Sequence, residues 1–253
     1  MFGRKKYRLG ISLSGGGARG FAHLGILKAL EEKGIKPDII SGVSAGAIAG
    51  AFIAAGKKPE EALAIIKQYR FFDLARLRYP RLGLFTLDHV KNSIENEISF
   101  KRIEELPTPL LIGTTDILEG KIKYFSEGSL SQIVQASAAI PILFNPIVID
   151  GKPYSDGGVL VNQPIKPLFE RCRKTIMINI SPVTPIKEVK NLAQIATRTF
   201  QLGVSSQDEE IRKKCTLYLE PPEISKYEIL DTKHAEEIFD IGYQYASKMK
   251  INV

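Results

Sequence analysis

The chain has 253 residues, of which 44% are hydrophobic and 25% are charged, and it carries a formal net charge of +7 at pH 7. These proportions are those of a globular protein with a sizeable core, and they exclude a disordered or fibrous chain. The two cysteines are too few for a disulfide framework, which suits a reducing cytosol. The most apolar stretch, residues 45–55, is too short to span a bilayer.

The basic N-terminal residues are not followed by an apolar run of about 7–15 residues, so we expect no signal peptide and a cytoplasmic protein. The excess of positive charge favours anionic partners. Basic residues are dispersed, and no zinc-finger, RNP or basic-region pattern occurs, so we expect peripheral contact with an anionic membrane rather than nucleic acid. Since no D-x-D-x-D-G loop occurs either, the sequence predicts no metal site, and it predicts no cofactor.

The first third of the chain predicts two strands that each run into a glycine-rich turn. Alternating apolar residues at 9–13 predict a strand that leads into Gly15–Gly20, and an amphipathic helix follows. Residues 37–41 predict a second strand, which leads into Gly42–Gly46 and a helix of small residues. Further along, Asp150-Gly151 between two short extended runs predicts a β-hairpin.

Strands and helices alternate through the rest of the chain. Further strands are expected at 109–117, 121–126, 147–149, 153–155, 174–180 and 215–220, and further helices from residue 59, at 86–98, from 129 to before 141, at 188–204 and at 232–250. This alternation predicts an α/β fold with three α/β/α layers around a mostly parallel central sheet. No linker or repeat divides the chain, so we expect a basic extension at 1–8 and one domain at 9–253.

The segment Gly42-Val43-Ser44-Ala45-Gly46 matches the G-x-S-x-G pattern of a nucleophile elbow. Such a turn between a strand and a helix lifts a serine hydroxyl clear of its backbone. Glycines flank the serine because a Cβ at Gly42 or Gly46 would collide with the adjoining strand or helix. The helix N-terminus also presents a positive dipole end to a developing oxyanion. Ser44 is therefore a candidate nucleophile.

The loop Gly15–Gly20 has two interpretations. It matches the dinucleotide fingerprint G-x-G-x-x-G, but that motif needs an acid at the end of the second strand, and here Asp38 precedes this strand. Successive glycine amides also form an oxyanion hole. Because the ends of two parallel strands can lie side by side, the second interpretation places Gly15, Gly16 and Gly17 beside Ser44, and it is the one that we favour.

A serine nucleophile needs a base, which is usually a histidine. The chain has three histidines, and we expect His23 and His89, which lie in predicted helices, to be surface or core residues rather than bases. The order Ser44, Asp156, His234 reproduces the Ser…Asp…His order of α/β-hydrolases, so a triad with His234 remains open. Two features argue against this triad. The α/β-hydrolase fold places the elbow deep in the sheet, whereas here it follows only two predicted strands. His234 also lies in the first turn of a predicted helix whose apolar residues form a packing face of their own.

Asp156, in Ser155-Asp156-Gly157-Gly158, is the other candidate base. A carboxylate with an ordinary pKa near 3.9 is a weak base. Burial in an apolar pocket would raise that pKa, and a hydrogen bond to Ser44 would let the carboxylate act. Taken alone, the motif favours an ordinary Asp-Gly turn, and only its combination with the other two motifs favours a catalytic base.

Taken together, the motifs Gly15–Gly20, Gly42–Gly46 and Asp156-Gly157-Gly158 resemble the patatin-like phospholipase family. The segment Ala136–Pro141, with Phe144 and Pro146 after it, shares this resemblance, which covers residues 9–164. The resemblance implies a patatin-like fold and a catalytic dyad without histidine, in which Ser44 is the nucleophile and Asp156 the base. It places the oxyanion hole at the amides of Gly15, Gly16 and Gly17. The residues that support these motifs are Arg19, Gly20, Gly42, Gly46, Gly157 and Gly158.

By this resemblance the protein is an acyl hydrolase acting on phospholipids or lysophospholipids, with no metal or cofactor. Two alternatives remain: transfer of the acyl group to an acceptor other than water, and a non-catalytic module that binds a nucleotide through the glycine loop. Residues 71–85 interleave aromatic residues, leucines and arginines, which is consistent with a lid or a membrane-contacting flap and equally with a loop that covers the core.

Overall fold

The computed structural model describes residues 5–69, 87–182, 184–186, 188–189, 194–195, 198–199, 202, 208–229 and 232–251. The hypothesised flap at 71–85 and most of the helix expected at 188–204 lie outside the described residues. In the described ranges, no helix has the length and apolarity needed to cross a membrane.

The described strands form one eight-stranded sheet in the order β5-β6-β3-β2-β1-β7-β8, with β4 paired to β3 outside this path. The strands are β1 (Tyr7–Leu13), β2 (Ile39–Val43), β3 (Leu110–Asp116), β4 (Lys121–Phe125), β5 (Ile147–Ile149), β6 (Lys152–Asp156), β7 (Cys172–Ile178) and β8 (Leu217–Leu219). The pairings β1–β2, β1–β7, β2–β3 and β7–β8 are parallel, whereas β3–β4, β3–β6 and β5–β6 are antiparallel. The prediction of a mostly parallel central sheet is confirmed.

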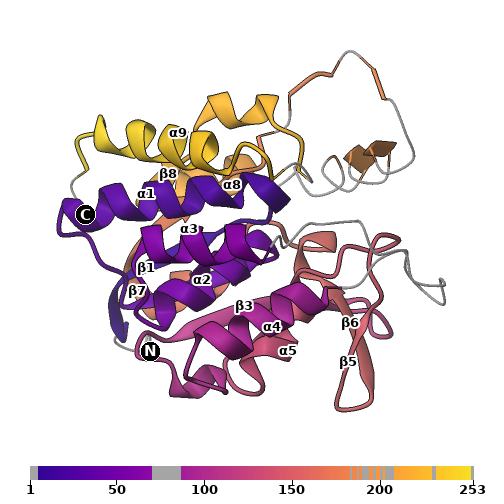
Figure 1. Ribbon diagram of the computed structural model, residues 1–253. Coiled ribbons are helices and arrows are strands. Elements are labelled where there is room, and N and C mark those ends of the chain that lie inside the picture. Colours follow the sequence, from indigo (N-terminus) through magenta and orange to yellow (C-terminus); the bar gives the residue numbers. More distant parts are fainter. Residues whose placement is uncertain are drawn as a thin grey trace.

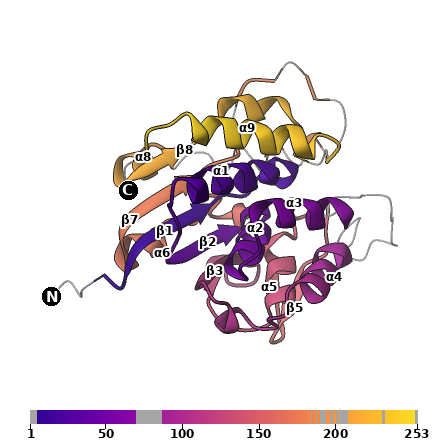
Figure 2. The same cartoon turned by 60° about the vertical axis from the view of Figure 1, so that its left-hand side comes forward.

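Helices lie on both faces of this sheet (Figures 1 and 2). They are α1 (Phe21–Glu32), α2 (Ala45–Ala54), α3 (Pro59–Gln68), α4 (Asp88–Glu97), α5 (Leu130–Ser137), α6 (Lys166–Arg171), α8 (Asp208–Lys214) and α9 (Ala235–Ser247), with short 3₁₀ helices η1 (Gly17–Gly20), η2 (Ile103–Glu105), η3 (Gly157–Val159) and η5 (Pro222–Lys226). Helices α1 and α9 run side by side in both views. The three-layer α/β/α architecture is therefore confirmed.

The period-two pattern of the strands divides the core between the two faces. Leu9, Ile11 and Leu13 of β1 belong to a large core that α1, α2 and α9 complete. A smaller core on the opposite face includes Leu168 of α6 and Ile211 of α8. Because successive side chains of a strand point to opposite faces, the alternation in the sequence specified this arrangement.

Two local predictions are resolved by backbone geometry. The β5–β6 hairpin turns at Asp150 and Gly151, whose φ angles are 48° and 78°, as a two-residue turn with both central residues at positive φ requires. Strand β1 begins at Tyr7, so the last two residues of the expected extension 1–8 belong to the sheet. There the backbone N–H groups of Arg8 and Leu9 both donate to the carboxylate of Asp38.

Candidate active site

The register of β3 brings the ends of β2 and β6 together. β2 pairs with β3 as far as Val43 opposite Gly113, and β6 reaches Asp156 opposite Thr114, the next residue of β3. Since β4 pairs with residues 112–116 on the other edge of β3, β2 and β6 share one edge and run toward each other. Ser44 follows Val43 directly, so the nucleophile candidate and the base candidate lie at this junction.

The backbone at Ser44 has φ 53° and ψ −123°, a conformation that residues with a side chain rarely adopt. It lies at the N-cap position of α2 and is 5% exposed. A Cβ at Gly42 would collide with the backbone of Gly46, and one at Gly46 would collide with the carbonyl of Leu13. The predicted reason for both glycines is confirmed, and the strained serine backbone is typical of a functional position.

The side chain of Asp156 is completely buried, and burial raises its pKa to about 7. Oδ1 accepts the N–H of Gly158 at 2.7 Å, and the nearby Ser44 hydroxyl partly offsets the rise in pKa. Oδ2 is buried and accepts no regular hydrogen bond within the described part of the chain. Two hydrogen bonds hold the backbone of Asp156: its N–H donates to the carbonyl of Ala139, and its carbonyl accepts from the hydroxyl of Thr115. Asp156 thus presents one unsatisfied carboxylate oxygen on a rigid strand end.

The hydroxyl of Ser137 ties the elbow to the sheet, a role that the sequence did not indicate. The backbone N–H of Ser44 donates to Ser137 Oγ at 2.9 Å, and this hydroxyl donates to the carbonyl of Gly113 at 2.7 Å. Ser137 is fully buried at the last residue of α5. The three groups form a continuous chain of hydrogen bonds from the strained serine to β3.

We expect Ser137→Ala to leave two buried backbone groups unpaired and to lower Tm by several degrees, since each such group costs about 1–3 kcal/mol. If the hydroxyl positions Ser44, kcat on a p-nitrophenyl ester falls about 10–100-fold with little change in KM. Ser137→Thr, which keeps the hydroxyl, should retain more of kcat. A lower Tm with an unchanged kcat would restrict Ser137 to a role in stability.

The glycine loop lies beside Ser44 as predicted, but only part of it is available for an oxyanion. A Cβ built on Gly15 would lie 3.3 Å from Ser44 Cβ. The N–H of Gly15 donates to the carbonyl of Asn162 at 3.2 Å, so this amide is already used. Within the described residues the N–H groups of Gly16 and Gly17 have no acceptor. Of the three amides that the resemblance assigns to the oxyanion hole, those of Gly16 and Gly17 are therefore available, and the assignment itself stays a prediction.

The C-terminal part of the chain covers the outer side of this loop. Arg19 is buried and its guanidinium donates to backbone carbonyls, including that of Tyr227 at 2.8 Å, and burial lowers its pKa to about 10. The N–H of Ala18 donates to the carbonyl of Ile229 at 2.7 Å. Gly17 has φ 57°, and a Cβ there would collide with the same carbonyl. The arginine of the motif therefore holds the loop against residues 225–229.

His23 lies in the protein interior and forms a hydrogen bond with the backbone just before the glycine loop. Its Nε2 lies 2.8 Å from the carbonyl of Ser14, so Nε2 carries the proton and donates to it. The ring is fully buried, and burial lowers its pKa to about 4, so it is neutral at pH 7. His23 is thus a core residue, one of the two positions that were expected for it.

The other two histidines lie elsewhere. His234 is at the N-cap of α9 and is paired with Glu237 at 3.2 Å, with its ring centroid 5.5 Å from that of Tyr227. His89 lies on α4, half-buried. The two groups that lower the pKa of Asp156 by hydrogen bonding are the Ser44 hydroxyl and the Gly158 amide. No histidine is among the groups that shift this pKa.

Comparison with known families gives a direct assignment. The family model for patatin-like phospholipases matches residues 11–169. The chain belongs to this family. No cluster of three or more His, Cys, Asp or Glu side chains suited to a metal ion occurs among the residues that the structure describes.

Several relatives share this patatin-like region. An uncharacterised NTE family protein of Mycobacterium tuberculosis is 34% identical over 66% of this chain and 47% of its own length. The lysophospholipase NTE1 of Kluyveromyces lactis is 30% identical over 94% of this chain and 19% of its own length. The human patatin-like phospholipase domain-containing protein 6 is 28% identical over 94% of this chain and 20% of its own length. The patatin-like chain therefore spans about half or less of the length of these relatives.

Among solved structures, VipD from Legionella pneumophila matches with a TM-score of 0.55 and 16% identity, over 95% of this chain and 66% of that chain. At this identity the match shows the fold alone. It agrees with the central sheet and flanking helices described above.

Proposed function

We propose that this protein is a serine acyl hydrolase that cleaves the carboxylic ester of phospholipids or lysophospholipids with a Ser44–Asp156 dyad. The observation that carries the proposal is the meeting of a strained serine and a fully buried carboxylate where β2 and β6 end against β3. Membership of the patatin-like phospholipase family and the likeness to a yeast lysophospholipase support the substrate class.

The proposed chemistry begins when Oδ2 of Asp156 takes the proton of the Ser44 hydroxyl as that oxygen attacks the ester carbonyl carbon. The N–H groups of Gly16 and Gly17 stabilise the negative charge on the carbonyl oxygen. Asp156 then returns the proton to the leaving alcohol, and Ser44 keeps the acyl group as an ester. In the second half, Asp156 takes a proton from the water whose oxygen attacks the acyl carbon. It then gives this proton to Ser44 Oγ as the bond between that oxygen and the acyl carbon breaks, which releases the fatty acid and restores the free serine.

The packing around the glycine loop argues against nucleotide binding. A phosphate-binding loop needs several free amides at the start of its helix. Here the amides of Gly15 and Ala18 are bonded to backbone carbonyls, and the C-terminal segment lies against the loop. The residue that follows β2 is also Ser44 rather than an acid.

Activity should rise with pH through the neutral range, because Asp156 acts as a base only when it is ionised. Its pKa of about 7 predicts that kcat/KM increases through a midpoint near pH 7 and then levels off. Initial rates on a soluble p-nitrophenyl ester, measured from about pH 5 to 9, would show this limb. A profile that is flat over this range would contradict an Asp156 base with a raised pKa.

The direct test is a panel of diacyl and monoacyl phospholipids incubated with the wild-type protein and with Ser44→Ala, followed by analysis of products. We expect free fatty acid from at least one phospholipid class with the wild type and none with the variant. An added alcohol acceptor separates hydrolysis from acyl transfer, since transfer would yield a new ester instead of fatty acid. Peripheral contact with anionic membranes stays a prediction from the net charge of +7.

A further inference from the structure

Asn162 presents an unpaired amide close to Ser44 and the glycine loop. It follows Asp156 shortly after the 3₁₀ helix η3, and it is 7% exposed. Within the described part of the chain, neither the oxygen nor the nitrogen of this side-chain amide forms a hydrogen bond. Neither atom is fully enclosed, so the amide borders space that a ligand can enter. Because buried polar groups are nearly always hydrogen-bonded, this exception needs an explanation.

The position of the amide is given by its contacts with Gly15. A Cβ built on Gly15 would lie 2.4 Å from Oδ1 of Asn162 and 3.3 Å from Cβ of Ser44. The absent side chain of Gly15 therefore leaves a space that borders both the Asn162 amide and the serine. The backbone carbonyl of Asn162 also accepts the N–H of Gly15 at 3.2 Å. The residue that occupies the first amide of the glycine loop thus brings a side-chain amide to the same place.

Hydrogen bonds on both sides hold the backbone that carries Asn162. Before it, the N–H of Val161 donates to the carbonyl of Gly157 at 2.9 Å. After it, the carbonyl of Pro164 accepts from the hydroxyl of Ser41 on β2 at 2.6 Å. The amide therefore lies on a fixed segment, and donors that stabilise a transition state need such preorganisation.

We propose that the side-chain N–H of Asn162 donates a third hydrogen bond to the substrate oxyanion, beside those from Gly16 and Gly17. The inference rests on the proposed acyl hydrolase function. Because no hydrogen bond holds either end of the amide, its nitrogen is free to face the carbonyl oxygen of an ester that Ser44 attacks. Asn162 then replaces the Gly15 amide as a donor, and asparagine side chains can serve as donors in oxyanion holes.

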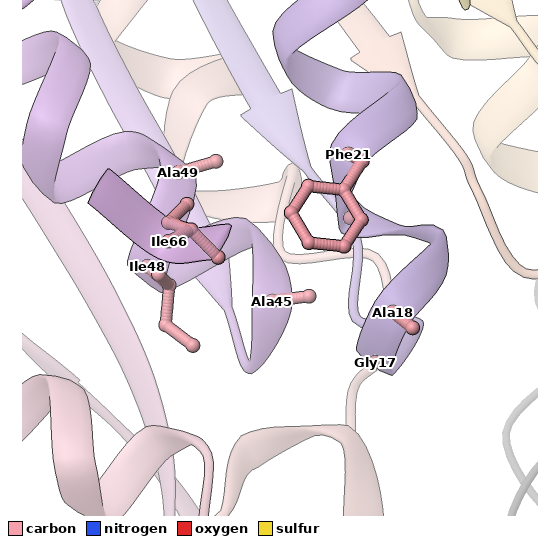
Figure 3. A pocket seen from close by; sticks show the side chains of 8 residues that line it. Gly17, Ala18, Phe21, Ala45, Ile48, Ala49 and Ile66 are labelled. Carbon is pink, nitrogen blue, oxygen red and sulfur yellow. The ribbon is translucent and has the colours of Figure 1, made fainter. Parts of the chain in front are cut away.

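The apolar side of the glycine loop offers no alternative donor. Figure 3 shows a narrow gap with Ala45, the residue after Ser44, across from Gly17 and Ala18. The residues that line this gap are glycines, alanines, isoleucines and one phenylalanine. None of these side chains can donate a hydrogen bond, so a third donor to an oxyanion at Ser44 does not come from this gap.

The test measures kcat and KM on a p-nitrophenyl ester, and Ki for a trifluoromethyl ketone, which adds to a serine hydroxyl and forms a tetrahedral oxyanion. Asn162→Ala should lower kcat by about 10²–10³-fold, the usual effect of removing one oxyanion donor, with little change in KM. Its Ki should rise by about the same factor, because the inhibitor needs the same donor. Asn162→Asp has nearly the same shape but no side-chain N–H, and it should lose at least as much. Asn96→Ala removes an exposed amide on α4 and should change neither kcat nor Ki.

Every variant keeps the backbone carbonyl at position 162 and its bond to Gly15, and Tm reports any folding defect. Asn162→Asp tests the donor even if Asn162→Ala does not fold. An unchanged Ki in Asn162→Ala, or an Asn162→Asp variant that keeps the wild-type kcat, would overturn the inference while the proposed function stands. If the wild type hydrolyses no ester, the proposed function fails, and the inference fails with it.

Discussion

Ser44→Ala should reduce ester hydrolysis to the background rate and abolish covalent labelling by a fluorophosphonate probe. Removing a serine nucleophile lowers kcat by about 10⁵–10⁶-fold in serine hydrolases, because binding and the oxyanion hole alone remain. The wild-type protein should be labelled once per chain, and mass spectrometry of the labelled peptide should place the adduct on Ser44. Labelling of the wild type at another residue, or activity that survives in the variant, would remove Ser44 from the mechanism.

The strained backbone at Ser44 provides a second variant that separates catalysis from stability. A residue with a side chain at φ 53° and ψ −123° stores about 1–3 kcal/mol of strain, which Ser44→Ala keeps and Ser44→Gly relieves. Both variants should be inactive. Ser44→Gly should melt about 2–4 °C above Ser44→Ala for each kcal/mol relieved, as measured by calorimetry. Equal melting temperatures would mean that the elbow is not strained in solution.

The sequence predicts those parts of the site that depend on local chemistry. The glycines at 42 and 46 mark a close approach that the structure contains, and Asp150-Gly151 marks the hairpin turn. Alternating apolar residues identify β1 and the face that it buries. These signals are strong because each depends on a few neighbouring residues and on the steric limits of one turn or strand.

The rest of the site depends on contacts between distant segments, which periodicity does not encode. The N–H of Gly15 is used by Asn162, and Ser137 supports Ser44 across 93 residues of sequence. Ser137 was visible only as part of the segment 136–141. Likewise, nothing in the sequence indicates that the segment ending at Ile229 covers the glycine loop. The sequence does not predict the junction of β2 and β6 on β3 either, because the junction depends on how both strands are aligned with β3.

Asp156→Asn should lower kcat by about 10²–10⁴-fold, the contribution that a general base usually makes. The amide keeps an oxygen that can accept the Gly158 N–H, so the turn remains intact while the proton acceptor is lost. His234→Ala should change kcat/KM by about twofold or less, because His234 is about half exposed and pairs with Glu237. Kinetics of the two variants on one ester distinguish a dyad from a triad, and a comparable loss in His234→Ala would support the triad.

As pH rises, the contribution of Asp156 to stability should fall while its contribution to activity rises, because burial raises the pKa of this carboxyl. Because the folded pKa of about 7 lies above the ordinary value of 3.8, the folded state binds the proton more tightly than the unfolded state. The stabilisation from this carboxyl is full below about pH 4 and is lost as pH rises through 7. Asp156→Asn has no charge to bury, so its Tm should exceed that of the wild type at pH 8, with the gap closing toward pH 4. A wild-type protein that is more stable than the variant at pH 8 would show that the ionised carboxylate is well solvated, and a carboxylate of that kind would be too weak a base for Ser44.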